Sequence, residues 1–222
     1  MKEVMQFFRV LMCRAALAVL SCSVAPVAVA SERLDLLLPG SLDGWTVRSF
    51  SGDTSYEAVV VEGVHAIRAR ADASASGLYR ENAVDLEQWP VMRWRWRVRE
   101  AVSPANERVK AGDDYAARLY VVATHPLFFW KTRAICYVWS SAGAPGEDWP
   151  NPYTGNVHMI VLNGKGDAAG QWTMHERDVA ADFKRYFGDA PQRIDAVALM
   201  TDTDQGGGQA TAWYADLRFE SR

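Results

Sequence analysis

The sequence predicts an all-β protein, a two-sheet antiparallel β-sandwich of the jelly-roll type with one short helix, and three observations lead to that prediction. Apolar and polar residues alternate with a period of two over most of the chain, as in strands that have one buried face. The alternating segments are short and are separated by clusters of Gly, Pro, Asp or Asn. Only one segment has helical periodicity, so the βαβ repeat of a parallel sheet is absent.

The N-terminal segment, residues 1–30, has the pattern of a secretory signal peptide. Basic residues precede an apolar run that ends in the small-residue triplet Ala28-Val29-Ala30. The run is shorter than the roughly 20 apolar residues that a membrane-spanning helix needs. We expect cleavage after Ala30, a periplasmic or secreted protein without a transmembrane span, and a single β-sandwich domain over residues 31–222. Because Val19-Leu20-Ser21-Cys22 resembles a lipobox, a lipoprotein anchored at Cys22 is the alternative.

Charge and cysteine content limit the partners of the processed chain. The formal charge of −3 becomes −5 once Lys2, Arg9, Arg14 and Glu3 are removed, and Cys136 is the only cysteine that stays. Binding to nucleic acid needs a basic field, so we expect no nucleic-acid partner. A single thiol also excludes an intramolecular disulfide, so the fold depends on its apolar core.

The strand from Met92 to Arg99 is the clearest in the chain. Arg occupies every odd position, whereas the even positions hold Met, Trp, Trp and Val. Since successive side chains of a strand point to opposite faces, one face is expected in the core and the other carries a ladder of guanidinium groups. Further strands are expected at residues 56–61, 65–71, 115–123, 134–140, 157–163, 171–178, 193–201 and 211–219.

Two segments depart from the strand pattern. Residues 141–156 hold three prolines and three glycines, and we expect either a functional loop or a surface crossover pinned by Trp149 and Tyr153. Residues 179–187 place Val179, Phe183 and Phe187 four apart ahead of a glycine, which predicts a short helix.

Long blocks of the chain resemble a known but uncharacterised family of exported bacterial proteins, domain of unknown function 3047. The blocks are LYRENAVDLEQWPVMRWRWRV, KAGDDYAARLYVV, KTRAICYVWSS, WPNPYTGNVHMIVLN, QWTMHERDVAADFKRYFG and ALMTDTDQGGGQATAWYADLRFE. The resemblance covers nearly the whole processed chain and implies no established activity. The segment from Trp213 to Phe219 also looks like the last strand of galactose-binding-like jelly rolls, a fold of many carbohydrate-binding modules and of some assembly factors.

Motifs for metal or nucleophilic chemistry fail at defining positions. His175-Glu176 begins like a zinc helix, but the second histidine is replaced by Val179. Residues 202–206 begin like a calcium loop and then lack its later ligands, so we predict a polar turn and no cofactor, with a structural Ca²⁺ at these carboxylates or near Asp216 left open. Cys136 lies in an apolar strand and is expected to be a buried, unreactive thiol.

The candidate ligand-binding residues are polar or aromatic side chains spread over several strands. They are Arg95, Arg97, Asp114, Arg118, Tyr120, His158, His175, Arg177 and Trp149. If the faces that carry them coincide, they form a polar floor suited to a sugar, with rings to stack and planar donors to bind hydroxyls or carboxylates. The alternative is a solvated outer face on which each Arg pairs with a carboxylate of a neighbouring strand.

Three functions follow as hypotheses. The first is non-catalytic binding of a glycan or small polar ligand on the polar sheet face. The second is an envelope interaction or assembly module, which contacts a protein partner through the apolar segment 128–130 and the loop 141–156. The third is a polysaccharide hydrolase or lyase that uses a grouping such as His158, His175 and Asp114.

Overall fold

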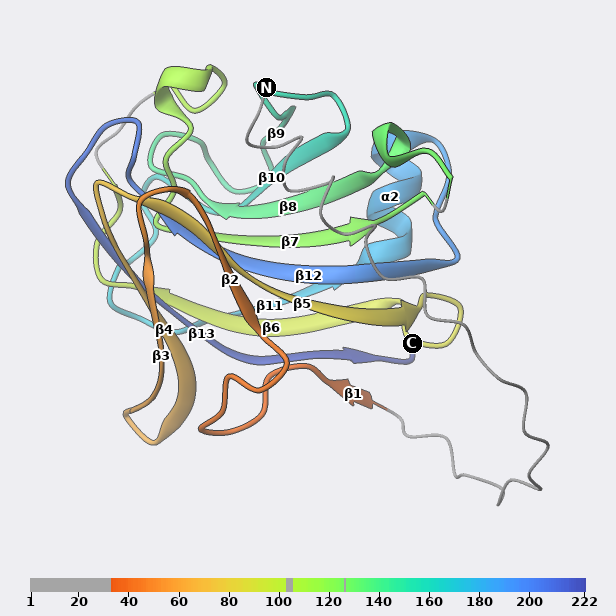
Figure 1. The fold of residues 1–222 in the computed structure, drawn as a ribbon, viewed down its shortest axis with the longest axis horizontal. Coiled ribbons are helices and arrows are strands. Elements are labelled where there is room, and N and C mark those ends of the chain that lie inside the picture. Colours follow the sequence, from red (N-terminus) through yellow and green to blue (C-terminus); the bar gives the residue numbers. More distant parts are fainter. Residues whose placement is uncertain (1–32, 103–105, 126) are drawn as a thin grey trace.

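The structure is a computed structural model that describes residues 33–102, 106–125 and 127–222. It consists of two β-sheets packed face to face, with one α-helix at one end (Figure 1). The predicted signal peptide and its lipobox lie outside the described residues. None of the helices that are described is long and apolar enough to cross a membrane.

The first sheet is antiparallel throughout. Its strands, in spatial order, are β11 (Thr173–Asp178), β6 (Val91–Val98), β13 (Gln209–Glu220), β4 (Val64–Asp72) and β3 (Ser55–Val61), with β1 (Arg33–Asp35) paired to β13. Figure 1 shows β1 beside the C-terminal end of the chain, in agreement with that pairing.

The second sheet has seven strands among the described residues. Its order is β2 (Thr46–Ser51), β5 (Ala75–Asp85), β12 (Arg193–Asp202), β7 (Ala117–Ala123), β8 (Arg133–Trp139), β10 (Val157–Asn163) and β9 (Asp148–Pro150). Two short 3-10 helices, η1 (Lys110–Gly112) and η2 (Phe129–Lys131), lie in the connections that flank β7. The predicted sandwich is therefore confirmed, and strands β1, β2, β5 and β9 are additions that the sequence pattern did not predict.

One strand pair of the second sheet explains the long irregular segment. β10 runs parallel to β8, with Val157 opposite Ala134, whereas the other pairs of this sheet are antiparallel. A parallel neighbour cannot be reached by a tight turn and needs a crossover of a dozen or more residues. Residues 140–156 form that crossover, which passes over the outer face of the sheet and adds the edge strand β9.

The crossover buries a second face of the sheet. The main core lies between the sheets and includes Trp94, Trp96, Tyr137 and Trp139. A smaller core on the opposite face of β7, β8 and β10 includes Cys136, Val138 and Met159 under Trp149 of β9. Burial on both faces explains why these strands are almost continuously apolar, and it confirms Cys136 as a buried thiol whose pKa is raised by burial.

The predicted helix is confirmed with its boundaries. α2 spans Val179–Phe187 and starts at Asp178, whose side chain accepts a 2.9 Å hydrogen bond from the Ala181 N–H. It ends at Gly188, where a φ of 88° places the backbone in the left-handed region that glycine tolerates. Val179 and Phe183 are buried against the main core, so the helix closes one end of the sandwich (Figure 1).

Trp94, Trp96, Trp139 and Trp213 occupy apolar positions of strands, which predicts all four in the core, and three of them lie there. Trp94, Trp96 and Trp139 are at most 2% exposed. Trp213 is the exception, since it alternates with the buried Tyr214 and lies on the outer face of the first sheet, 5.4 Å below the Arg97 guanidinium. That prediction was wrong because Trp213 and Tyr214 are adjacent in one strand and point to opposite faces, and Tyr214 is the one that faces the core.

Candidate functional site

An open cleft lies on the outer face of the second sheet, beside the part that the crossover covers. Its floor crosses three strands, because Gly77 of β5 pairs with Met200 of β12, and Met200 pairs with Arg118 of β7. The floor residues Ala75, Gly77 and Ala198 are small, so they leave a depression between larger neighbours. The empty space is about 680 Å³ when the open mouth of the cleft is included.

Three aromatic residues line this cleft. Phe50 comes from the edge strand β2, Tyr120 from β7, and Tyr153 from the crossover. A Cβ atom on Gly77 would lie 3.6 Å from the Phe50 ring, so a longer side chain at position 77 would fill the cleft. Polar residues complete the lining, namely Asp113, Asn151, Asp202, Asp204 and Gln205.

Arg118 lies at the floor and is almost wholly engaged within the protein. Its side chain is 2% exposed and lies 4.3 Å from the centre of the Tyr115 ring. Nε and one terminal nitrogen bind both carboxylate oxygens of Asp202, the Nε contact being 2.8 Å. The remaining N–H groups bind the carboxylate of Asp113 at 3.2 Å, its carbonyl oxygen, and the Tyr120 hydroxyl at 3.2 Å. All five guanidinium N–H donors are thus used.

The buried charged groups of the cleft change one another's pKa values. Burial raises the pKa of the Asp113 carboxyl, and the Arg118 charge offsets part of that rise. The pKa of Asp202 is likewise raised well above its usual value by burial, against the opposing effect of Arg118. Burial alone would lower the pKa of Arg118, but the carboxylates of Asp113 and Asp202 more than compensate, so the guanidinium stays charged.

Among the residues that the structure describes, one group of three carboxylates lies close enough together to be tested as a metal site. Asp114, Asp202 and Asp204 bring one oxygen each within 4.8 Å of the others. The oxygens of Asp114, however, accept the backbone N–H groups of Gln205 at 3.0 Å and Gly206 at 2.6 Å, and those of Asp202 bind Arg118. Calcium needs six to eight oxygen ligands, and a set already engaged with N–H donors does not fit that requirement.

Four of the predicted ligand-binding residues lie on this outer face. Arg118 and Tyr120 line the cleft, and Asp114 holds the turn at residues 205 and 206 beside it. Trp149 is 5% exposed, packs in the smaller core, and carries Arg108 at 4.7 Å from its ring. Trp149 therefore pins the crossover to the sheet, as one of the two interpretations of this segment expected.

Arg95 and Arg97 lie on the other side of the molecule. They project from β6 on the outer face of the first sheet, where Arg95 pairs with Asp216 at 2.6 Å and Arg97 with Glu62 at 2.8 Å. Arg95 also lies 5.4 Å from the Trp172 ring. The shared polar face that the sequence suggested is therefore not formed, because the whole sandwich separates Arg95 and Arg97 from Arg118.

His175, Arg177 and His158 turn toward the interior or the helix. His175 contacts Asn163 at 2.7 Å between the sheets, Arg177 binds the buried Asp182 through Nε at 2.9 Å, and His158 binds Asp148 at 2.7 Å. His158 also stacks on Tyr186 of α2 at 3.9 Å. Because Asp114 lies at the cleft instead, the catalytic grouping of His158, His175 and Asp114 is not assembled.

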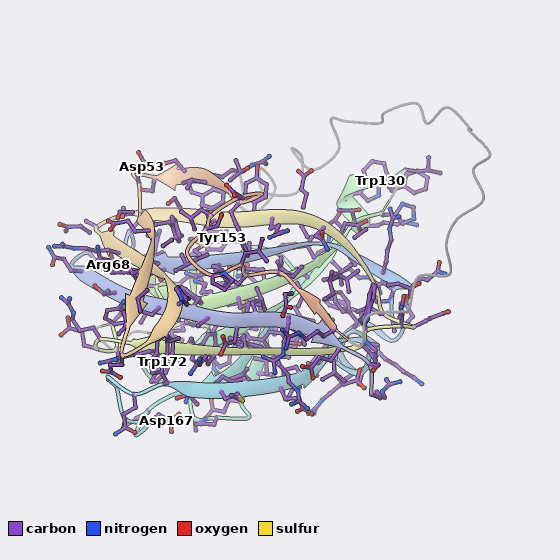
Figure 2. The ribbon with its side chains drawn as sticks, turned by 90° about the horizontal axis from the view of Figure 1, so that it is seen from below. Asp53, Arg68, Trp130, Tyr153, Asp167 and Trp172 are labelled. Atoms are coloured by element: carbon purple, nitrogen blue, oxygen red, sulfur yellow. The ribbon has the colours of Figure 1, made fainter. Side chains whose placement is uncertain are left out.

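The exposed tryptophans do not gather at one place either. Figure 2 shows Trp130 and Trp172 at opposite ends of the sandwich. The residues that line the cleft and were missed by sequence reasoning include Phe50, Asp113, Tyr153 and Asp204. Three of them lie in loops or next to them, where alternation carries no signal, and Phe50 belongs to a strand that the pattern did not predict.

Comparisons with known proteins bear on family and fold. A family model described as "Protein of unknown function (DUF3047)" matches residues 43–218, and no curated protein sequence matches the chain. Among solved structures, the family 11 carbohydrate-binding module of the cellulase Lic26A-Cel5E of Clostridium thermocellum is 9% identical over 87% of this chain and 96% of its own, with a TM-score of 0.48. The xyloglucanase domain of NopAA from Sinorhizobium fredii is 9% identical over 82% and 96%, with a TM-score of 0.43. The GH12 endoglucanase 3 of Trichoderma harzianum is 8% identical over 86% and 95%, with a TM-score of 0.44.

Proposed function

Since the chain belongs to the DUF3047 family, whose description names no activity, its function has to be inferred from its own site, and we propose that it binds a glycan or related polar ligand non-catalytically in the cleft of the second sheet. The proposal includes export, with removal of residues 1–30 and binding in the periplasm or outside the cell, on the signal-peptide pattern of those residues.

The lining of the cleft is the observation that supports this function. The aromatic side chains of Phe50 and Tyr153 line the cleft together with the carboxylate of Asp204 and the amide of Gln205. A sugar presents both apolar C–H faces, which stack on rings, and hydroxyls, which need hydrogen-bond partners. A cleft that combines the two kinds of side chain over a floor of small residues fits that chemistry.

Two substitutions of opposite kind test the cleft. Gly77→Val fills it with a side chain that suits a strand, and Tyr153→Ala removes one wall. We expect each to reduce glycan affinity by about tenfold or more while the fold is kept. Trp172→Ala, which removes an aromatic side chain near Arg95 on the first sheet, is the matched control and should bind like the wild type.

A thermal-shift screen against oligosaccharides gives the first reading, with calorimetry for each hit. A ligand at about 100 times its Kd stabilises by about 2.7 kcal/mol, which corresponds to a rise in Tm of about 5–10 °C for a chain of this size. Equal loss of affinity in Trp172→Ala, or unchanged affinity in Gly77→Val, would locate binding elsewhere.

The second candidate function is an interaction module for a protein partner, and a different observation favours it. Leu127, Phe128 and Trp130 are 73%, 38% and 57% exposed, which forms an apolar patch around η2. If the patch binds a partner or a second copy, Phe128→Ser with Trp130→Ser should abolish the complex seen by native mass spectrometry. Cleft binding should be unaffected by that change.

A further inference from the structure

The charged groups of the cleft decide which glycans it can take, given that it binds a glycan as proposed above. Among the described residues, the charged side chains that line it are Asp113, Asp202, Asp204 and Arg118. Three carboxylates thus face one guanidinium, and Asp114 adds a fourth carboxylate close by. The formal charge of the cleft is negative, so a ligand carboxylate entering it would be repelled.

Arg118 offers a ligand carboxylate no hydrogen bond that would offset this repulsion. An arginine has five N–H donors, and each of those of Arg118 already binds Asp113, Asp202 or Tyr120. A ligand carboxylate therefore finds no open donor on this side chain, although a buried Arg in a cleft is the usual residue for binding one.

Two further cations, Arg48 and Lys110, lie on the same face and reduce the negative formal charge without reversing it, because Asp113, Asp114, Asp202 and Asp204 still outnumber the three cations. Arg48 lies 4.3 Å from the centre of the Tyr79 ring and donates to the Tyr79 hydroxyl. Lys110 is exposed and lies 5.3 Å from the centre of the Tyr153 ring, where water and salt screen its charge.

Among the charged side chains that line the cleft in the described part of the chain, the one with an open position for a ligand is an acceptor. Asp204 is half-buried, one of its oxygens accepts from the Gln205 amide at 2.9 Å, and the other oxygen accepts no hydrogen bond from the residues that the structure describes. A ligand group that bonds to this Asp204 oxygen must donate, as a hydroxyl or an amino group does.

We infer that the cleft selects glycans that carry hydroxyl or amino groups and no acidic group, and that it rejects uronic acids of the same backbone. Stacking on Phe50 and Tyr153 does not distinguish the neutral sugar from its acid, so the discrimination comes from the carboxylates. Specificity of this kind depends on a repulsive element that is already built into the site.

Calorimetry with ligands matched in backbone tests the inference. The probes are the β-1,4-linked hexamers of glucose, glucosamine and glucuronic acid, and the β-1,4-linked hexamers of mannose and mannuronic acid, at low salt with EDTA. We expect a neutral or amino hexamer to bind, and we expect the affinity of its acidic counterpart to be lower by about tenfold or more. In Asp204→Asn, which removes a partly exposed charge, that ratio should shrink several-fold, and added salt should shrink it further.

The outcomes separate the selectivity from the function. An acidic hexamer that binds as tightly as its neutral counterpart, or a ratio unchanged in Asp204→Asn, would overturn the charge selectivity and leave glycan binding intact. Binding of no hexamer, neutral or acidic, would instead count against the proposed function of the cleft itself.

Discussion

Arg118 illustrates how a single residue can support a cleft without serving its ligand. Its guanidinium is 2% exposed and holds Asp113 and Asp202, which come from different segments of the chain. Each carboxylate is buried, and burying either charge without the Arg118 cation would cost free energy of folding. The residue therefore positions the acidic wall of the cleft, and its contribution is to stability and shape.

Arg118→Met should accordingly destabilise the protein strongly. Removing one partner of a buried ion pair leaves uncompensated charge and typically costs about 3–5 kcal/mol. The double variant Arg118→Met/Asp202→Asn removes one of the two stranded carboxylates as well and should recover part of that loss. Urea unfolding of both variants and the wild type measures the difference, and a cost below about 1 kcal/mol for the single variant would contradict this role.

At the scale of elements, the crossover of residues 140–156 determines which part of the outer face of the second sheet is covered and which part is open. It connects the parallel strands β8 and β10, buries Trp149 over the smaller core, and places Tyr153 at the cleft. The uncovered part of the same sheet face is the cleft. The sequence allowed two interpretations of this segment, a crossover and a functional loop. The structure shows the crossover, and a role of Tyr153 in binding a ligand is part of our proposal.

The start of the crossover depends on a close approach to the turn after β10. Gly164 packs against Gly143, whose carbonyl oxygen also accepts a 2.9 Å hydrogen bond from the Lys165 N–H, and a Cβ at position 164 would overlap that oxygen. Gly164→Ala should therefore cost about 2 kcal/mol or more.

Gly155→Ala is the matched control for this close approach. Gly155 lies near the other end of the crossover, where a Cβ would meet nothing within 4 Å, so the change should stay within about 0.5 kcal/mol. Thermal unfolding of the two variants tests the contrast, and equal stability would show that the backbone at residue 164 can shift freely.

For the whole molecule, the contact between the two sheets is partly polar. His175 of the first sheet and the Trp96 indole N–H both contact the Asn163 side-chain oxygen of the second sheet at 2.7 Å. Burial lowers the pKa of His175 to about 4, so the ring is neutral in the folded protein at neutral pH. The packing of the sheets is thereby linked to pH.

The sign of that linkage gives a prediction. Between pH 6.5 and about pH 4 the unfolded chain protonates His175 and the folded chain does not, so this histidine's contribution to stability is present above pH 6.5 and is lost as the pH falls. The loss is at most about 3 kcal/mol.

A neutral variant isolates this histidine from other groups. His175→Gln cannot titrate, so its unfolding free energy should fall less steeply than that of the wild type between pH 6.5 and pH 4.5. The carboxyls of Asp113 and Asp202, whose raised pKa values act in the opposite direction, are present in both proteins and cancel in the comparison. Parallel stability curves for the two proteins would contradict the prediction.

Local patterns account for most of what could be predicted. Alternation identified the strand with Trp94 and Trp96 inward. The four-residue spacing of apolar side chains over residues 179–187, ahead of Gly188, identified α2. β5 was missed because its first half, around Gly77, is small and polar in sequence. The same small residues form the floor of the cleft. Small side chains in this part of β5 therefore made the strand hard to predict and also leave the space of the cleft.

The sequence by itself determined which residues share a face of one strand, where the helix begins and ends, and that the chain resembles the DUF3047 family. Only the tertiary structure decided which strands are neighbours and in which sheet, and so placed Arg97 and Arg118 on opposite sides of the molecule. The physical reason is range: side-chain direction follows from backbone geometry within a few residues, whereas strand order depends on packing between segments far apart in the chain.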